Sequence, residues 1–211
     1  MHPNEELELK MLLSADEFAS FVSLYPQLVF KPQHNVYFES HNSDHYAFRI
    51  RYTSEQQLFT LKQKLNDSTM EYEKPFSGDY LDDEDIISTL ESFSEFPPFI
   101  VMGELLTLRA IHDTGKAEMC FDINFYNGVT DYEIEYEVYE PHDHVAAFTE
   151  ILKKAGLEYR PNHTSKYKRC KHTLPQKNNY TVYVPGNKRF SFIQPVRIQC
   201  GYQAAIPAEY Q

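Results

Sequence analysis

The sequence contains little glycine and cysteine, and it has no long apolar run. None of its seven glycines shows the GxGxxG or GxxxxGKS/T spacing of a phosphate-binding loop, which excludes Rossmann and P-loop proteins. The three cysteines form no CxxC pair, so neither a disulfide framework nor a zinc knuckle is indicated, and a reducing compartment fits best. No stretch approaches the roughly 18 apolar residues of a membrane span, and the N-terminus lacks a signal peptide's apolar run. We therefore expect a cytoplasmic protein without membrane contacts.

The composition is that of a folded, aromatic-rich protein with unevenly distributed charge. The 211 residues include 16 Tyr and 15 Phe, and the length favours one large domain with an appendage. The net charge of −11 argues against general nucleic-acid binding. Residues 1–158 carry 30 acidic and 11 basic side chains, whereas residues 159–211 carry nine basic and one acidic. We predict a main domain over 1–170 and a basic, proline-interrupted, loosely structured extension over 171–211, with one strand near 179–184.

Alternating apolar and polar residues predict eight β-strands. These strands are expected at 5–12, 35–40, 45–52, 57–64, 69–76, 103–111, 116–125 and 131–139. Three amphipathic helices lie between or after them, at 14–25, 82–93 and 141–156. The first opens with the capping box Ser14-Ala15-Asp16-Glu17, and the third ends at Gly156 after two lysines that suit a helix C-terminus. We expect the apolar faces of these helices to pack on the strands.

Each predicted strand has one apolar face and one polar face, because successive side chains point to opposite sides. The polar faces are sorted by charge: the first and last strands carry carboxylates, and the middle strands mainly Lys and Arg. The charged residues on them are Glu6, Glu8, Lys10, Arg49, Arg51, Lys62, Lys64, Arg109, Asp122, Glu133, Glu135 and Glu137. An open sheet with its charges in water explains any one of these strands. Since adjacent strands of like charge repel, six sorted strands favour polar faces that surround a bound polyanion.

Closure of this sheet into a barrel explains both faces at once. The charged faces then line a tunnel, and the apolar faces lie outside, where helices cover them. We therefore predict an α+β fold: an eight-stranded antiparallel closed β-barrel with amphipathic helices packed on the outside. Carboxylates crowded into such a tunnel repel one another unless a divalent cation binds them, and Mg²⁺ or Mn²⁺ prefers carboxylate and phosphate oxygens. A polyphosphate with a bound Mg²⁺ or Mn²⁺ would pair with both the basic and the acidic side chains of the tunnel.

The segment Glu6-Leu7-Glu8-Leu9-Lys10 has the ExExK pattern and resembles the signature of the CYTH domain, the triphosphate tunnel metalloenzyme superfamily. Further segments resemble that family's other tunnel motifs, in the family's order: Arg49-Ile50-Arg51, Thr60-Leu61-Lys62, Arg109, Asp122 and Glu133-Ile134-Glu135. The spacing is similar to that of small bacillus-type bacterial CYTH proteins. The resemblance covers about residues 4–170, and near its end Lys166 and Arg169 resemble basic residues of the family's last helix. Residues 171–211 have no counterpart.

The resemblance implies a metal-dependent phosphohydrolase that acts on inorganic triphosphate or on a small organic triphosphate, such as thiamine triphosphate or a nucleotide. Its implied substrate-binding cations are Lys10, Arg49, Arg51, Lys62, Lys64, Arg109, Lys166 and Arg169. Its implied ligands for Mg²⁺ or Mn²⁺ are Glu6, Glu8, Asp122, Glu133 and Glu135. Glu8 and Glu135 are the expected catalytic residues. We expect a triphosphate-containing small molecule as the partner and a chain that is a monomer or a homodimer.

Other functions remain open at this point. The same tunnel in relatives is associated with adenylate cyclase activity, and a non-catalytic triphosphate sensor would need the same residues. Paired glutamates also occur in glycosidases, but that function leaves the basic strands unexplained. His142 and His144 begin a helix, where residues two apart do not face one another, so they do not indicate a metal site.

Overall fold

The polar and apolar alternation builds one continuous antiparallel sheet. The computed structural model describes residues 3–66, 68–174 and 181–182. Its main strands are β1 (Pro3–Leu13), β2 (Lys31–Phe38), β3 (Tyr46–Tyr52), β4 (Gln57–Lys64), β5 (Thr69–Phe76), β6 (Ile100–Asp113), β7 (Ala117–Tyr126) and β8 (Val129–Val138). A two-residue strand, β9 (Thr181–Val182), pairs with the start of β6 and falls within the strand predicted at 179–184. Of the rest of the predicted extension, residues 171–174 are described and include the end of the helix Lys166–His172, whereas 175–180 and 183–211 lie outside the described residues.

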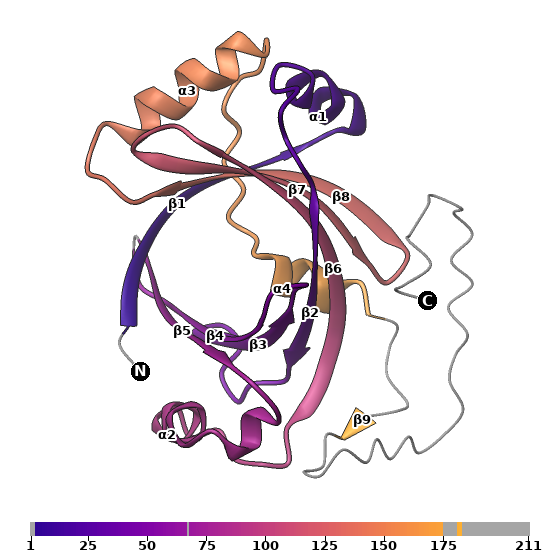
Figure 1. Cartoon of the computed structure of the whole chain (residues 1–211), viewed down its shortest axis with the longest axis vertical. Coiled ribbons are helices and arrows are strands. Elements are labelled where there is room, and N and C mark those ends of the chain that lie inside the picture. The colour runs from indigo at the N-terminus through magenta and orange to yellow at the C-terminus, as the bar shows by residue number, and fades with distance from the viewer. Residues whose placement is uncertain (1–2, 67, 175–180, 183–211) are drawn as a thin grey trace.

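The eight main strands close into a barrel. They follow the order β2-β3-β4-β5-β1-β8-β7-β6, and β2 also pairs with β6 in a register that runs from Lys31 opposite Arg109 to Phe38 opposite Val101. Figure 1 looks into the barrel, with β1 on one side and β2 and β6 on the other. This arrangement confirms the predicted eight-stranded, antiparallel, closed β-barrel.

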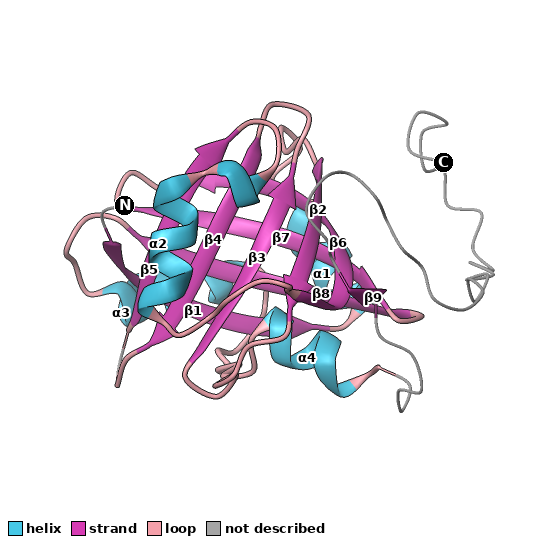
Figure 2. Cartoon of the chain, turned by 90° about the horizontal axis from the view of Figure 1, so that it is seen from below, coloured by secondary structure: helices cyan, strands magenta, loops and turns pink. Residues whose placement is uncertain are grey.

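Helices cover the outside of the barrel and one of its ends. The three predicted helices are α1 (Ala15–Val22), α2 (Glu84–Ser92), which follows the short 3-10 helix η1 (Tyr80–Asp82), and α3 (His144–Lys154). The predicted capping box is present, since the Ser14 side chain accepts from the Glu17 amide and the Glu17 side chain accepts from the Ser14 amide. Figure 2 shows α2 against the outer surface of the strands and a fourth helix, α4 (Lys166–His172), at one end of the barrel. Among the described residues, no helix is long and apolar enough to span a membrane.

The hydrophobic core lies between the barrel and the helices. One cluster joins α1 and α3 to β1, β7 and β8, and its fully buried members include Phe21, Phe121, Ile134 and Phe148. A second joins α2 to β3 and β4 and includes Phe48, Phe59, Leu61 and Leu90. Because neighbouring side chains along a strand alternate, the apolar contacts outside leave the polar residues to face inward. The core therefore fixes the direction of the tunnel-lining side chains.

The strand boundaries differ from the prediction where the sequence lacks alternation. β2 begins at Lys31, four residues before the predicted start at 35, through the polar segment Lys31-Pro32-Gln33-His34. This segment is a strand because it pairs with β6 across the closure of the barrel, a long-range contact that local patterning does not encode. Likewise, β6 begins at Ile100 instead of 103.

Candidate active site in the barrel

The barrel encloses a cavity of about 970 Å³. The predicted site residues that line it are Glu6, Glu8, Lys10, Arg49, Arg51, Lys62, Lys64, Arg109, Glu135 and Lys166. Asp122 and Glu133 adjoin this wall and are fully buried, whereas Lys64 is exposed. Arg169, a buried residue of α4, pairs with Glu133. The structure thus brings ten of the predicted residues to one cavity and places Asp122, Glu133 and Arg169 next to it.

Arg49 and Arg51 on β3 form the basic side of the cavity. No carboxylate oxygen of a described residue lies within 4.0 Å of either guanidinium group. Both groups instead donate hydrogen bonds to neutral side chains. Arg49 Nη1 donates to the Tyr37 hydroxyl at 3.2 Å, and Arg51 Nε donates to Asn35 Oδ1 at 3.0 Å. Burial and the nearby charges of Arg49 and Arg109 lower the pKa of Arg51 to about 10, which leaves it charged at neutral pH. This side of the cavity carries positive charge available to an anion.

Glu6 and Glu8 on β1 meet Glu137 on β8 in a first acidic cluster. Carboxylate oxygens of the three lie within 4.8 Å of one another. Glu6 pairs with Lys62 at 2.5 Å, Glu8 with Lys10 at 2.7 Å and Glu137 with Arg109 at 3.1 Å. The buried Oε2 atom of Glu8 has no hydrogen-bond partner among the described residues. This cluster therefore keeps an oxygen that is free to accept a further cation.

The electrostatics of the first cluster reflect crowded carboxylates. Burial, followed by the charges of Glu8 and Glu71, raises the pKa of Glu6 to about 7, although Lys62 opposes this shift. Burial, with Glu135 and Glu8, also raises the pKa of Glu137. Burial opposes ionisation of Glu8 as well, but Lys10 and Lys62 outweigh it and lower its pKa. The oxygen-only donor set and the unpartnered Glu8 atom fit a hard divalent cation such as Mg²⁺ or Mn²⁺.

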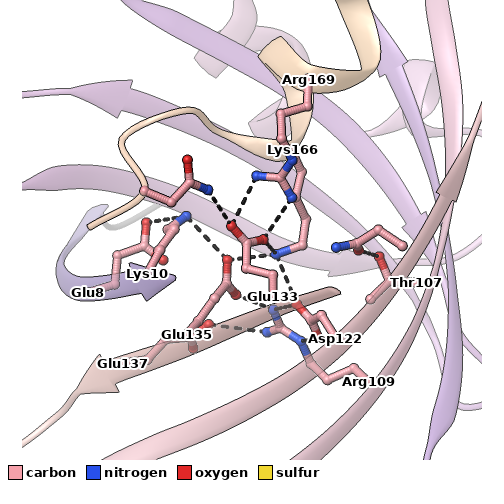
Figure 3. Close-up of polar contacts among 12 residues, drawn as sticks. Glu8, Lys10, Thr107, Arg109, Asp122, Glu133, Glu135, Glu137, Lys166 and Arg169 are labelled. Atoms are coloured by element: carbon pink, nitrogen blue, oxygen red, sulfur yellow. Dashed lines mark hydrogen bonds and ion pairs between the residues drawn. The ribbon is translucent and has the colours of Figure 1, made fainter. Parts of the chain in front are cut away.

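A second acidic cluster of Asp122, Glu133 and Glu135 lies under α4 (Figure 3). Lys166 pairs with all three carboxylates, at 2.9 Å, 2.6 Å and 2.6 Å respectively. Arg109 pairs with Asp122 at 2.7 Å and also with Glu135. Although burial opposes ionisation, Lys166, Lys10 and Arg109 hold the pKa of Glu135 well below its usual range. The carboxylates of this cluster are therefore already neutralised by the protein.

The five predicted metal ligands thus fall into two clusters, and the basic residues differ in their partners. Lys166 and Arg169, which the resemblance assigns to the substrate, contact carboxylates of the barrel here; a role in phosphate binding stays a prediction. Asn162, from the segment before α4, donates to Glu133 and helps to place α4 over the cluster.

Sequence reasoning assigned no role to several tunnel residues. Glu71 and Glu73 on β5 line the cavity, and Glu71 pairs with Lys62 at 3.3 Å. The alternation of 69–76 places both on one face and could have identified them. Glu137 was placed on the tunnel face, but its meeting with Glu8 follows from the register of β1 and β8. Glu118 and Cys120 form a third group with Glu137, in which burial raises the pKa of the thiol.

The comparisons with known proteins agree with this geometry. The model of the CYTH domain family matches residues 4–170, which is most of the chain. The chain belongs to the CYTH family. This family assignment confirms the resemblance carried by the ExExK segment and the later tunnel motifs.

Individual relatives extend the comparison. A Bacillus subtilis protein with the provisional name triphosphatase YjbK is 27% identical over 177 residues, which cover 74% of this chain and 88% of the relative. A crystal structure from Bacillus halodurans, provisionally named an adenylate cyclase, superposes with a TM-score of 0.71 at 28% identity and covers 80% of this chain and 98% of that chain. The Hippeastrum protein HpAC1 shares the fold, with a TM-score of 0.60 at 20% identity over 78% of this chain and 95% of that chain. The two solved structures thus share the fold of this chain, while the names of the relatives differ in reaction.

Proposed function

We propose that this CYTH protein hydrolyses a linear triphosphate with the help of Mg²⁺ or Mn²⁺. One observation supports this proposal most directly. Arg49 and Arg51, which pair with no carboxylate of a described residue, line the same cavity as the Glu6–Glu8–Glu137 cluster, in which one oxygen of Glu8 has no partner among the described residues. A triphosphate and a divalent cation are the ligands that complement both features. The provisional name of YjbK supports hydrolysis as the reaction.

The basic residues would bind the triphosphate oxygens. The Nε atom of Arg51 donates to Asn35, and its two terminal nitrogens, which have no hydrogen-bond partner among the described residues, would bind a phosphate. The Tyr37 hydroxyl accepts from Arg49 and orients its guanidinium, which would bind the same phosphate chain as Arg51. Lys62, which lines the cavity and pairs with Glu6 and Glu71, would exchange these carboxylates for phosphate oxygens. Because phosphoryl transfer needs charge stabilisation more than covalent chemistry, such fixed cations supply much of the catalysis.

Glu6, Glu8 and Glu137 are the residues that would hold the divalent cation. When bound there, the cation would polarise phosphoryl oxygens and neutralise charge that develops during transfer. Glu8 is the better candidate for orienting the attacking water, because both oxygens of Glu135 are occupied by Lys10, Lys166 and Arg109. Glu135 would then act by holding these cations in position.

A substrate panel tests the proposal. Inorganic triphosphate, ATP and thiamine triphosphate are each incubated with Mg²⁺ or Mn²⁺, and released phosphate and cyclic AMP are measured. Metal-dependent phosphate release supports the proposal, and the best substrate identifies the leaving group. Cyclic AMP from ATP without phosphate release would assign the cyclase reaction suggested by the name of the Bacillus halodurans protein. Metal-dependent binding without turnover would show a sensor.

A further inference from the structure

The Asp122–Glu133–Glu135 cluster has the composition of a metal site but already contains a cation. Its three carboxylates offer oxygens within 4.8 Å of one another, and all three side chains are buried. The Lys166 ammonium lies among them, 2.9 Å from Asp122 Oδ2, 2.6 Å from Glu133 Oε2 and 2.6 Å from Glu135 Oε1 (Figure 3). We propose that Lys166 is the resident cation of this cluster and takes the place of a divalent metal ion, so that, of the two acidic clusters in the cavity wall, the unmodified chain binds metal at Glu6–Glu8–Glu137 and not at Asp122–Glu133–Glu135.

The ion pairs of Lys166 leave no room for a second cation. Carboxylate oxygens of Asp122, Glu133 and Glu135 all lie within 2.9 Å of its ammonium nitrogen, and Glu135 Oε1 accepts a hydrogen bond from it. A Mg²⁺ ion lies about 2.0–2.1 Å from each of its oxygen ligands. An ion bound to these same oxygens would therefore clash with the ammonium group and be repelled by its charge. Lys166 would have to leave the cluster before a metal could enter it.

Several contacts of α4 oppose such a departure. Ser165 caps the helix by accepting from the Lys168 amide, and Arg169 pairs with Asp131 at 2.8 Å and with Glu133 at 3.0 Å. At the other end of the helix, the Asn127 side chain donates to the Cys170 carbonyl at 2.9 Å. The partners of Arg169 and Cys170 come from β8 and from the turn between β7 and β8, so α4 is fixed to the strands that carry the cluster. Lys166 is therefore a positioning residue, held where it neutralises Asp122, Glu133 and Glu135.

The charge balance of the two clusters points in the same direction. Four basic residues pair with the three carboxylates under α4. Besides Lys166, Arg109 pairs with Asp122, Arg169 with Glu133 and Lys10 with Glu135. A divalent ion added there would have to compete with these cations for the same carboxylate oxygens. The Glu6–Glu8–Glu137 cluster instead keeps the unpartnered oxygen of Glu8, so a metal ion gains more attraction at that position.

The inference rests on the proposed metal dependence, but it is tested by metal binding without substrate. Mn²⁺ is titrated into the full-length chain, and bound ions are counted by electron paramagnetic resonance and calorimetry. We expect one site in the unmodified chain. We expect a second site in Lys166→Met, which removes the ammonium but keeps much of the side-chain length. Lys168→Met is the matched control, because Lys168 lies on the same helix and pairs only with Asp44, at 3.4 Å, among the described residues; it should leave one site.

Further variants keep the result decisive. In the unmodified background, Asp122→Asn should leave Mn²⁺ binding unchanged, whereas Glu8→Gln should abolish it; this pair decides the question if Lys166→Met does not fold. The inference is overturned by loss of an ion in Asp122→Asn, or by a folded Lys166→Met protein that binds no additional ion. If the unmodified chain binds no Mn²⁺, the proposed metal dependence fails, and the appearance of one site in Lys166→Met would still support the inference about Lys166.

Discussion

Arg51 and Arg109 both face the tunnel, but they should respond to substitution in opposite ways. Arg51 has no carboxylate partner among the described residues, whereas Arg109 pairs with Asp122, Glu135 and Glu137. Arg51→Met should therefore weaken substrate binding without loss of folding stability, and Arg109→Met should destabilise the fold. The comparison separates a charge reserved for a ligand from one that is neutralised by the protein.

The magnitudes follow from the contacts. The two terminal nitrogens of Arg51 would each make a charge-assisted hydrogen bond worth about 1.5–3 kcal/mol. A net loss of about 3 kcal/mol corresponds to an increase in KM of roughly 100-fold. Removal of Arg109 leaves buried carboxylates with fewer partners, which costs about 3–5 kcal/mol of unfolding free energy, at the lower end because Lys166 and Lys10 remain.

Two measurements check this prediction. Urea unfolding without substrate gives the stability of each variant, and steady-state kinetics with inorganic triphosphate give KM and kcat. Arg51→Met should unfold at the same urea concentration as the unmodified chain or higher. If Arg51→Met instead lost as much stability as Arg109→Met, or if it kept an unchanged KM, the reasoning that Arg51 is held ready for an anion would be wrong.

Three further predictions concern the metal, the C-terminal segment and the core. Glu8→Gln should reduce metal-dependent phosphate release by at least 100-fold while Glu73→Gln, in the same cavity but outside the cluster, keeps Mn²⁺ binding; equal binding by both variants in calorimetry would contradict this. Truncation after Leu174, beyond the end of α4, should preserve kcat and KM if 175–211 is an accessory segment; loss of activity in a folded truncated chain would show that this segment contributes to function. Phe121→Ala should cost about 3–5 kcal/mol in urea unfolding, because Phe121 is fully buried against α1, whereas Phe96→Ala, at a side chain 57% exposed, should change stability by less than about 0.5 kcal/mol.

The direction of the tunnel side chains could be predicted from the sequence because it depends only on local alternation. Once Leu9 and Met11 pack outside against the helices, Glu8 and Lys10 must point inward. The same rule correctly separated the charged face from the apolar face in the strands that carry the tunnel residues. Closure of the barrel followed from a physical argument about sorted charge, and the structure confirms it.

The partners within the tunnel could not be predicted in this way, because they depend on register and long-range packing. The pairing of β1 with β8 sets Glu8 opposite Glu137 and Lys10 opposite Glu135, and nothing in either segment alone encodes that alignment. The position of Lys166 depends on the chain between α3 and α4, where the Asn162 amide donates to the Lys10 carbonyl at 2.8 Å. Local patterns therefore gave the list of charged residues but not the division into two acidic clusters.

The location of the apolar packing outside the barrel separates what keeps this protein folded from what it recognises. Aromatic and aliphatic side chains between strands and helices supply the hydrophobic stabilisation, while the lumen carries the charged side chains that we propose bind the ligand. Substitutions in the lumen that leave its ion pairs intact should therefore be tolerated more readily than changes to a conventional interior. Such an architecture lets descendants of one ancestor diverge in specificity while they inherit the same scaffold.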